Sequence, residues 1–145
     1  MEKYNIEMSF TLTRIGETKL IDVQYKYKQL AAEFCKFYYS TYDKNFKDLA
    51  NSYHPKAQFT VNDVEVSGIN NFFNLLEHFG FRSCVHHDLN VQCQPIGEEN
   101  LLLNVSGSIT INNSIFINKF VETLLIQRDN FNHFYIFSTM LKISD

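Results

Sequence analysis

The sequence predicts an α+β fold, a curved antiparallel sheet with three helices packed on one of its faces. Two observations predict this class. Apolar residues recur at spacings of three and four between about residues 23 and 79, and three long runs rich in β-branched and aromatic residues then fill residues 101–143. Helices that come before a series of antiparallel strands gather on one face of the sheet, which gives the α+β layout.

The length and composition indicate one globular domain. The 145 residues are 45% apolar and 20% charged, and a chain of this length buries roughly 68–70% of its unfolded surface. The formal net charge of −3 argues against direct binding to nucleic acid, for which a basic face is expected. No apolar run is long enough to span a membrane and no secretory signal is evident, so we expect a soluble intracellular protein.

The chain divides into an N-terminal extension, residues 1–20, and a domain, residues 21–145. Apolar and polar residues alternate in part of the extension, which fits either a strand or a flexible tail. The domain begins with a helix for which Asp22 is a suitable N-cap and which ends near Asp43. A second, shorter helix is predicted to stop before Pro55, because the residue before a proline is pushed away from helical angles.

The middle of the domain is predicted to form a hairpin and a third helix. Residues 57–61 and 64–66 pair around Asn62-Asp63, two residues that tolerate turn geometry. Ser67 is then expected to cap the third helix, and Gly80 is expected to end it. The remaining chain is predicted to form four long antiparallel strands.

The later strands are predicted to be apolar on both faces. A half-solvated strand alternates apolar and polar residues. In residues 115–126 and 134–143, apolar residues occur at both odd and even positions, so both faces of these strands are expected to be apolar. The helices of the chain can cover only one face of such a sheet. We therefore expect a second protein to cover the other face.

No catalytic or metal-binding motif is present. The sequence has no phosphate-binding glycine loop, nucleophile elbow or His-Glu-x-x-His pattern. His86, His87 and Asp88 form the one dense polar cluster, and on a strand His86 and Asp88 share a face while His87 points to the other. This pattern favours a partly solvated sheet face over a metal site.

The three cysteines indicate buried thiols in a reducing compartment. Cys35, Cys84 and Cys93 are an odd number without close pairs, which favours neither a disulfide framework nor a zinc site. We expect no metal and no cofactor.

The order of elements and several local patterns resemble the nuclear transport factor 2 family over about residues 24–145. The patterns occur in order and at fitting intervals, which makes the set fairly specific. They are Ala32-Glu33-Phe34, Tyr38-Tyr39 and Asp43 in the first helix, Leu49 and Tyr53 in the second, Val61-Asn62, Val66-Ser67-Gly68 and Phe72-Phe73 around the third, and Cys93-Gln94-Pro95-Ile96, Val105-x-Gly107-Ser108 and Ser138 to Asp145 in the strands.

Within this family the resemblance is strongest to the small subunit of the mRNA export receptor. It implies a non-enzymatic subunit of nucleus and cytoplasm that pairs, sheet against sheet, with a related domain of a larger export receptor. Lys142 stands where that subfamily carries an arginine that pairs with an acid on its partner. The acidic residues with which the transport factor proper holds the GTPase Ran correspond here to the uncharged Asn62, Asn112 and Ser114, which argues against Ran carriage.

Three functions are therefore considered. The first is the export-type adaptor, and the second is a homodimeric import carrier that binds Phe-Gly repeats of nucleoporins. The third is an enzyme of the isomerase or dehydratase type on the same fold, for which Tyr38, His87 and Asp88 are the candidate catalytic residues. For the first, the expected partner-binding residues come from both faces of the sheet: Phe116, Lys119, Phe120, Glu122, Tyr135, Phe137 and Lys142.

Overall fold

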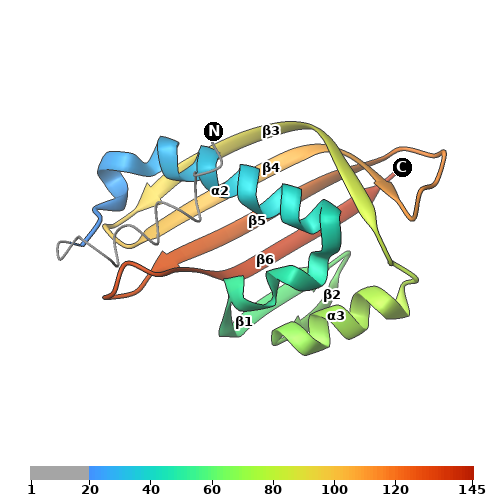
Figure 1. Ribbon diagram of the computed structural model, residues 1–145, viewed down its shortest axis with the longest axis horizontal. Coiled ribbons are helices and arrows are strands. Elements are labelled where there is room, and N and C mark those ends of the chain that lie inside the picture. The colour runs from blue at the N-terminus through green and yellow to red at the C-terminus, as the bar shows by residue number, and fades with distance from the viewer. Residues whose placement is uncertain (1–19) are drawn as a thin grey trace.

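The computed structural model describes residues 20–145, and its elements are shown in Figure 1. Nearly all of the predicted N-terminal extension, including its strand or tail, lies outside the described residues. The described elements are α2 (Val23–Asn45), the 3₁₀-helix η2 (Phe46–Ser52), β1 (Tyr53–Val61), β2 (Val64–Ser67), α3 (Ile69–His78), β3 (Cys84–Ile96), β4 (Asn100–Ile111), β5 (Asn118–Arg128) and β6 (Phe134–Ser144).

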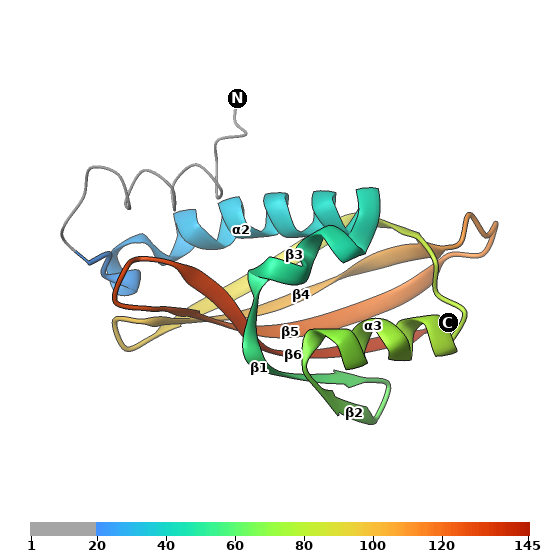
Figure 2. The same cartoon turned by 60° about the horizontal axis from the view of Figure 1, so that its bottom comes forward.

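The six strands form one curved sheet in the order β2-β1-β6-β5-β4-β3, which confirms the α+β class (Figure 2). Every neighbouring pair is antiparallel except β1 and β6, which run parallel with Phe59 opposite Thr139. The prediction of an antiparallel sheet is wrong at this pair. Strand alternation gives the faces of a strand but does not reveal which distant strand becomes its neighbour.

The described residues contain two α-helices, not the three that were predicted. The first is confirmed, and the Asp22 side chain caps it by accepting a hydrogen bond from the Gln24 N–H at 2.9 Å. The second predicted helix is the seven-residue η2, for which Asn45 provides a new N-cap. Because Tyr53 already pairs in β1, the segment is too short for a stable α-helix, and Pro55 lies inside β1.

Glycines set both ends of α3. Gly68 occupies the N-cap position at φ 84° without a side-chain cap, so the predicted cap by Ser67 is wrong. The Ser67 hydroxyl instead donates a hydrogen bond to Gln58 on the neighbouring strand. Gly80 ends the helix at φ 78°, as predicted, and its N–H donates to the Glu77 carbonyl.

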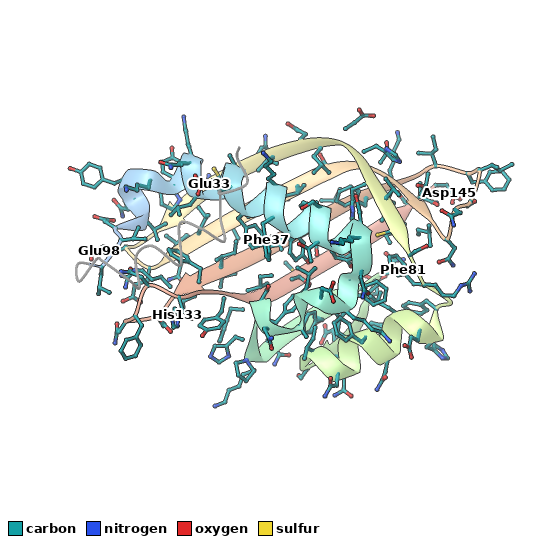
Figure 3. The ribbon with its side chains drawn as sticks, in the orientation of Figure 1. Glu33, Phe37, Phe81, Glu98, His133 and Asp145 are labelled. Atoms are coloured by element: carbon teal, nitrogen blue, oxygen red, sulfur yellow. The ribbon has the colours of Figure 1, made fainter. Side chains whose placement is uncertain are left out.

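Both helices pack on the concave face of the sheet. α2 crosses this face, and α3 packs against β1, where the Phe72 and Phe59 rings stack with centroids 4.4 Å apart. Phe81, labelled in Figure 3, follows α3 and packs its ring against Phe46 and Tyr42. The helices therefore share one hydrophobic core with the sheet. No helix in residues 20–145 is long and apolar enough to cross a membrane.

A β-bulge in β3 reverses which side chains face the core. The register with β4 shifts between His87 and Asn90, and Asp88 adopts a φ of 55°. Before the bulge His86 pairs with the buried Ile109, and after it the odd-numbered residues take the core side. His86 and Asp88 therefore do not share a regular strand face, and the predicted alternation is wrong at this point.

Candidate partner-binding surface

The convex side of the sheet, called the outer face below, is not covered by any element of residues 20–145. Strand alternation and register together identify the side chains on it. Its central members are Leu102, Asn104, Ser106 and Ser108 on β4, Lys119, Val121, Thr123, Leu125 and Gln127 on β5, and Tyr135, Ser138, Met140, Lys142 and Ser144 on β6.

The outer face is less apolar than the sequence predicted. Most of its side chains carry hydroxyl or amide groups, and apolar side chains form a central patch in which Val121 is 43% and Met140 53% exposed. The difference arises because residues 115–117, which were counted as strand, lie in the loop between β4 and β5. The chain thus exposes a limited apolar patch instead of a wholly apolar face.

A groove of about 540 Å³ crosses the apolar patch. Val121 and Met140 line it, and its charged lining residues are Lys119, Lys142 and Asp63. Cations beside an apolar floor fit a partner surface with an apolar anchor and a flanking acid.

A second apolar feature, the β4–β5 tip, consists of Ile115, Phe116 and Ile117, which are 89%, 74% and 64% exposed. Its base is held in place by Asn112, whose side chain accepts from the Arg82 and Ser83 N–H groups and donates to the Gly80 carbonyl. A loop anchored in this way, with three adjacent exposed apolar side chains, is suited to binding, because little entropy is lost when it docks. Strand periodicity predicted a strand for these residues, whereas the structure has a loop here.

The structure separates the seven predicted partner-binding residues into groups. Lys119 and Lys142 are exposed on the outer face, and Phe116 lies in the β4–β5 tip. Tyr135 and Phe137 are half-buried on β6 beside His54, at ring distances of 6.2 and 4.8 Å. Phe120 and Glu122 are each 1% exposed on the concave face, so a partner on the outer face does not reach them.

Glu122 is the centre of a buried hydrogen-bond network. Its carboxylate accepts from the Tyr39 hydroxyl at 2.8 Å and from the Tyr38 hydroxyl at 3.1 Å, and Tyr38 also bonds Tyr53 at 2.9 Å. Burial raises the pKa of Glu122, while the hydrogen bonds from both tyrosines and the nearby His86 oppose the rise. The acid is thus held in place by donors but sealed from solvent.

This network gives a pH-dependent prediction for Glu122→Gln. Because the pKa of Glu122 is raised in the folded state, the contribution of this side chain to stability is greatest below the unfolded pKa of about 4.3 and falls, by at most about 1.4 kcal/mol per pH unit, as pH rises from that value to the folded pKa. A glutamine at this position does not ionise and so has no free-energy cost of burying a charge, although one tyrosine hydroxyl then lacks its acceptor. The difference in unfolding free energy, variant minus wild type, should increase between pH 4.5 and 8 in urea titrations.

The Glu65→Gln variant serves as the control for Glu122→Gln, because Glu65 is exposed on the short strand β2. Its stability curve should run parallel to that of the wild type. If Glu122→Gln also ran parallel from pH 4.5 to 8, the buried acid would have no effect on the pH dependence of stability.

The three candidate catalytic residues do not meet in one site. Tyr38 is buried in the core, whereas His87 is exposed on the outer face and Asp88 is exposed in the β3 bulge. A cavity of about 960 Å³ lies at the other end of the sheet, between β1 and the β5–β6 turn, and contains none of the three. Arg128 and Asp129 line this cavity, and the Asp129 carboxylate already accepts from two backbone N–H groups of its own turn.

One polar contact was missed by sequence reasoning. Asp43, near which the first helix was predicted to end, accepts hydrogen bonds from the His86 backbone N–H and lies 2.6 Å from the His86 ring nitrogen Nδ1. The two residues are separated by 43 positions, and no local pattern indicates that they meet.

The comparisons agree with the observed geometry. A family model described as the nuclear transport factor 2 (NTF2) domain matches residues 30–143. Nuclear transport factor 2B of Arabidopsis thaliana is 28% identical over 112 residues, which cover 77% of this chain and 89% of that protein. The solved structure of nuclear transport factor 2 from Cryptosporidium parvum matches with a TM-score of 0.73 at 22% identity, over 82% of this chain and 95% of that chain.

The same fold occurs in proteins with other roles. The complex of the yeast deubiquitinase Ubp3 with its cofactor Bre5 contains a chain that matches with a TM-score of 0.61 at 17% identity, over 81% of this chain and 97% of that chain. The structure of LinA matches with a TM-score of 0.68 at 13% identity, over 86% of this chain and 90% of that chain. At these identities the likeness shows the fold alone.

Proposed function

The chain belongs to the nuclear transport factor 2 domain family, and we propose that it is a non-enzymatic adaptor of nucleocytoplasmic transport that pairs with a second protein through its outer face. The names of its relatives support a transport-related role. The observation that carries the pairing is the uncovered apolar patch around Val121 and Met140, flanked by Lys119 and Lys142. The proposed partner is a related domain of a larger mRNA export receptor, which would place the protein in nucleus and cytoplasm.

The charge of the outer face favours a different partner over a second copy. In a two-fold symmetric dimer the same patch meets itself, so the lysines of one copy would approach those of the other. Lys119 and Lys142 are both exposed beside the patch, against the single acid Asp63 in the same lining, and like charges across an interface cost free energy. A related domain that carries acids opposite these lysines avoids this cost.

The separation of Tyr38, His87 and Asp88 and the closed burial of Glu122 support a non-enzymatic role. The pairing of Bre5 with Ubp3 gives a precedent for a protein of this fold that serves as the cofactor of another protein. The groove in the apolar patch supports one alternative, a homodimeric carrier that holds Phe-Gly repeats of nucleoporins.

Sedimentation velocity distinguishes these functions. We expect the purified chain to form a heterodimer when an export-receptor domain of the same family is added, and to bind Phe-Gly repeat peptides weakly or not at all on its own. A stable homodimer that binds the peptides would support the carrier. A monomer that binds neither would contradict both proposals.

The β4–β5 tip should add to this association. Replacing Phe116 with serine removes a 74%-exposed ring and should weaken partner binding about tenfold, as expected for the loss of one partly buried aromatic anchor. Isothermal titration calorimetry measures the change. Phe131→Ser is the matched control, because Phe131 is 73% exposed but lies in the β5–β6 turn, and equal effects of both variants would exclude the tip from the interface.

A further inference from the structure

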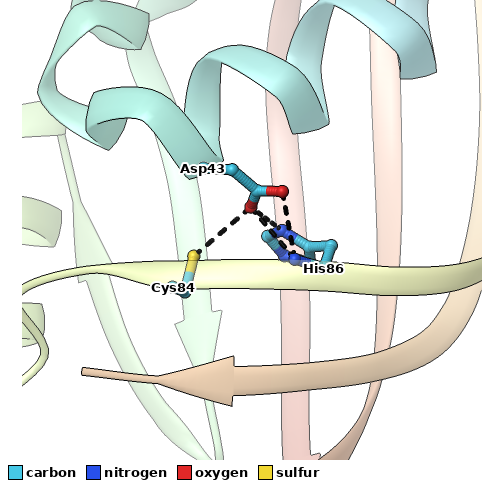
Figure 4. Close-up of side chains that lie close together, drawn as sticks. All are labelled: Asp43, Cys84 and His86. Atoms are coloured by element: carbon cyan, nitrogen blue, oxygen red, sulfur yellow. Dashed lines mark hydrogen bonds and ion pairs between the residues drawn. The ribbon is translucent and has the colours of Figure 1, made fainter. Parts of the chain in front are cut away.

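Three side chains with different donor atoms meet where the end of α2 passes over the start of β3 (Figure 4). They are Asp43, Cys84 and His86, and their donor atoms all lie within 4.8 Å of one another. The Asp43 Oδ1 atom is 2.6 Å from the His86 Nδ1 atom and 3.7 Å from the Cys84 Sγ atom. The Asp43 side chain is partly exposed, while the side chains of His86 and Cys84 are buried.

The fold brings these donors together in a fixed arrangement. Cys84 and His86 are two positions apart on β3, before the bulge, so both side chains point to the concave face. The His86 ring is held by Tyr39, Tyr42 and Phe120, with centroids 4.7, 5.1 and 4.9 Å away. Asp43 is fixed by both of its oxygens, which accept from the His86 backbone N–H. Preorganised donors reduce the entropy that metal binding costs.

We propose that Asp43, Cys84 and His86 form a binding site for a zinc ion. Thiolate, imidazole and carboxylate are the three ligand types of zinc sites, whereas Mg²⁺ and Ca²⁺ are bound by oxygen atoms. Three protein ligands leave the fourth tetrahedral position to a water molecule, which the partly exposed Asp43 side of the cluster admits. The site is independent of the outer face and of any partner bound there.

The distances fit this ion after a small adjustment. Ligand atoms bound to zinc at roughly 2.0–2.3 Å in a tetrahedron lie about 3.3–3.7 Å apart. The Asp43 Oδ1 to Cys84 Sγ distance of 3.7 Å already fits. The Asp43 Oδ1 to His86 Nδ1 distance of 2.6 Å must open by about 0.7 Å, as expected when a metal ion replaces the shared proton of a hydrogen bond.

Zinc binding at this site displaces the proton of the Cys84 thiol. Burial, and secondarily the Asp43 carboxylate, raise the pKa of the Cys84 thiol, so the thiol keeps its proton without a metal. Zinc displaces that proton to solvent and leaves a thiolate ligand. Zinc bound at His86 Nδ1 requires that this nitrogen carry no proton, so the proton shared with Asp43 must also leave it, either to Nε2 of the same ring or to solvent.

The test is a titration of the full chain with zinc chloride and, separately, with cobalt chloride. We expect one zinc ion per chain by calorimetry, and a sulfur-to-cobalt charge-transfer band in the near ultraviolet. Cys84→Ser and Asp43→Asn should each weaken zinc binding by on the order of 100-fold and abolish or diminish the band. Both variants are nearly isosteric, and circular dichroism without metal checks that each one folds.

Cys93→Ser and His87→Gln are the matched controls, since both residues lie on β3 but outside the cluster. Each should bind zinc within about threefold of the wild type, because neither removes a ligand. The proposal is overturned if the wild type shows no cobalt band and no zinc binding at metal concentrations on the order of 100 µM, far above the range of structural zinc sites. It is equally overturned if Cys84→Ser binds zinc as tightly as the wild type, because the ion would then lie elsewhere.

Discussion

Replacing Val121 with glutamate should abolish association with the partner domain, with a loss of affinity of at least about 30-fold. Val121 lies at the centre of the apolar patch on the outer face and lines its groove. A carboxylate there would be desolvated against apolar partner groups, and substitutions at buried interface anchors commonly cost about 2 kcal/mol or more. Calorimetry and sedimentation with the export-receptor domain measure the loss.

Val64→Glu is the matched control for Val121→Glu. Val64 is 40% exposed, close to the 43% of Val121, but it lies on the short edge strand β2. It should change affinity by less than about threefold, and both variants should retain the wild-type melting temperature because neither residue is in the core. Unchanged affinity in Val121→Glu would place the interface somewhere other than the outer face.

Replacing Gly107 with alanine should destabilise the fold by about 3 kcal/mol, because the site leaves no room for a methyl group. A Cβ atom on Gly107 would lie 2.6 Å from the His87 carbonyl oxygen and 3.1 Å from that of Asp88. It would also meet the Phe120 ring at 3.2 Å. The bulge and the buried ring would both have to move, and neither is a flexible surface group.

The destabilisation of Gly107→Ala is measured by urea unfolding followed by circular dichroism. A loss of about 3 kcal/mol corresponds to a melting temperature lower by roughly 10 °C in a domain of this size. Ser108→Ala, at the next position of β4, should stay within about 0.5 kcal/mol of the wild type. A Gly107→Ala variant as stable as the wild type would show that the bulge can relax without cost.

The sequence predicted those parts of the fold that depend on neighbouring residues. The apolar stripe of α2, its Asp22 cap and the turn at Asn62-Asp63 each follow from residues within one or two turns of chain. The family resemblance was specific because its short local patterns occur in the family's order along the helices and strands.

The parts that the sequence did not predict depend on contacts between distant residues. The parallel pairing of β1 with β6 joins Phe59 to Thr139, and Asp43 meets His86 across 43 positions. The bulge at Asp88 was missed because the apolar–polar alternation continues through it. Because the strand prediction included neither this bulge nor the loop at residues 115–117, it assigned too many apolar side chains to the outer face.

The bulge in β3 should also hinder pairing of its free edge with another chain. Within residues 20–145, β3 is an edge strand whose free side could template another strand, and it carries exposed valine and leucine side chains. The bulge at Asp88 twists this edge out of register, and Pro95 removes one N–H donor near its end. For this chain to form cross-β aggregates through β3, the bulged strand should therefore first have to straighten.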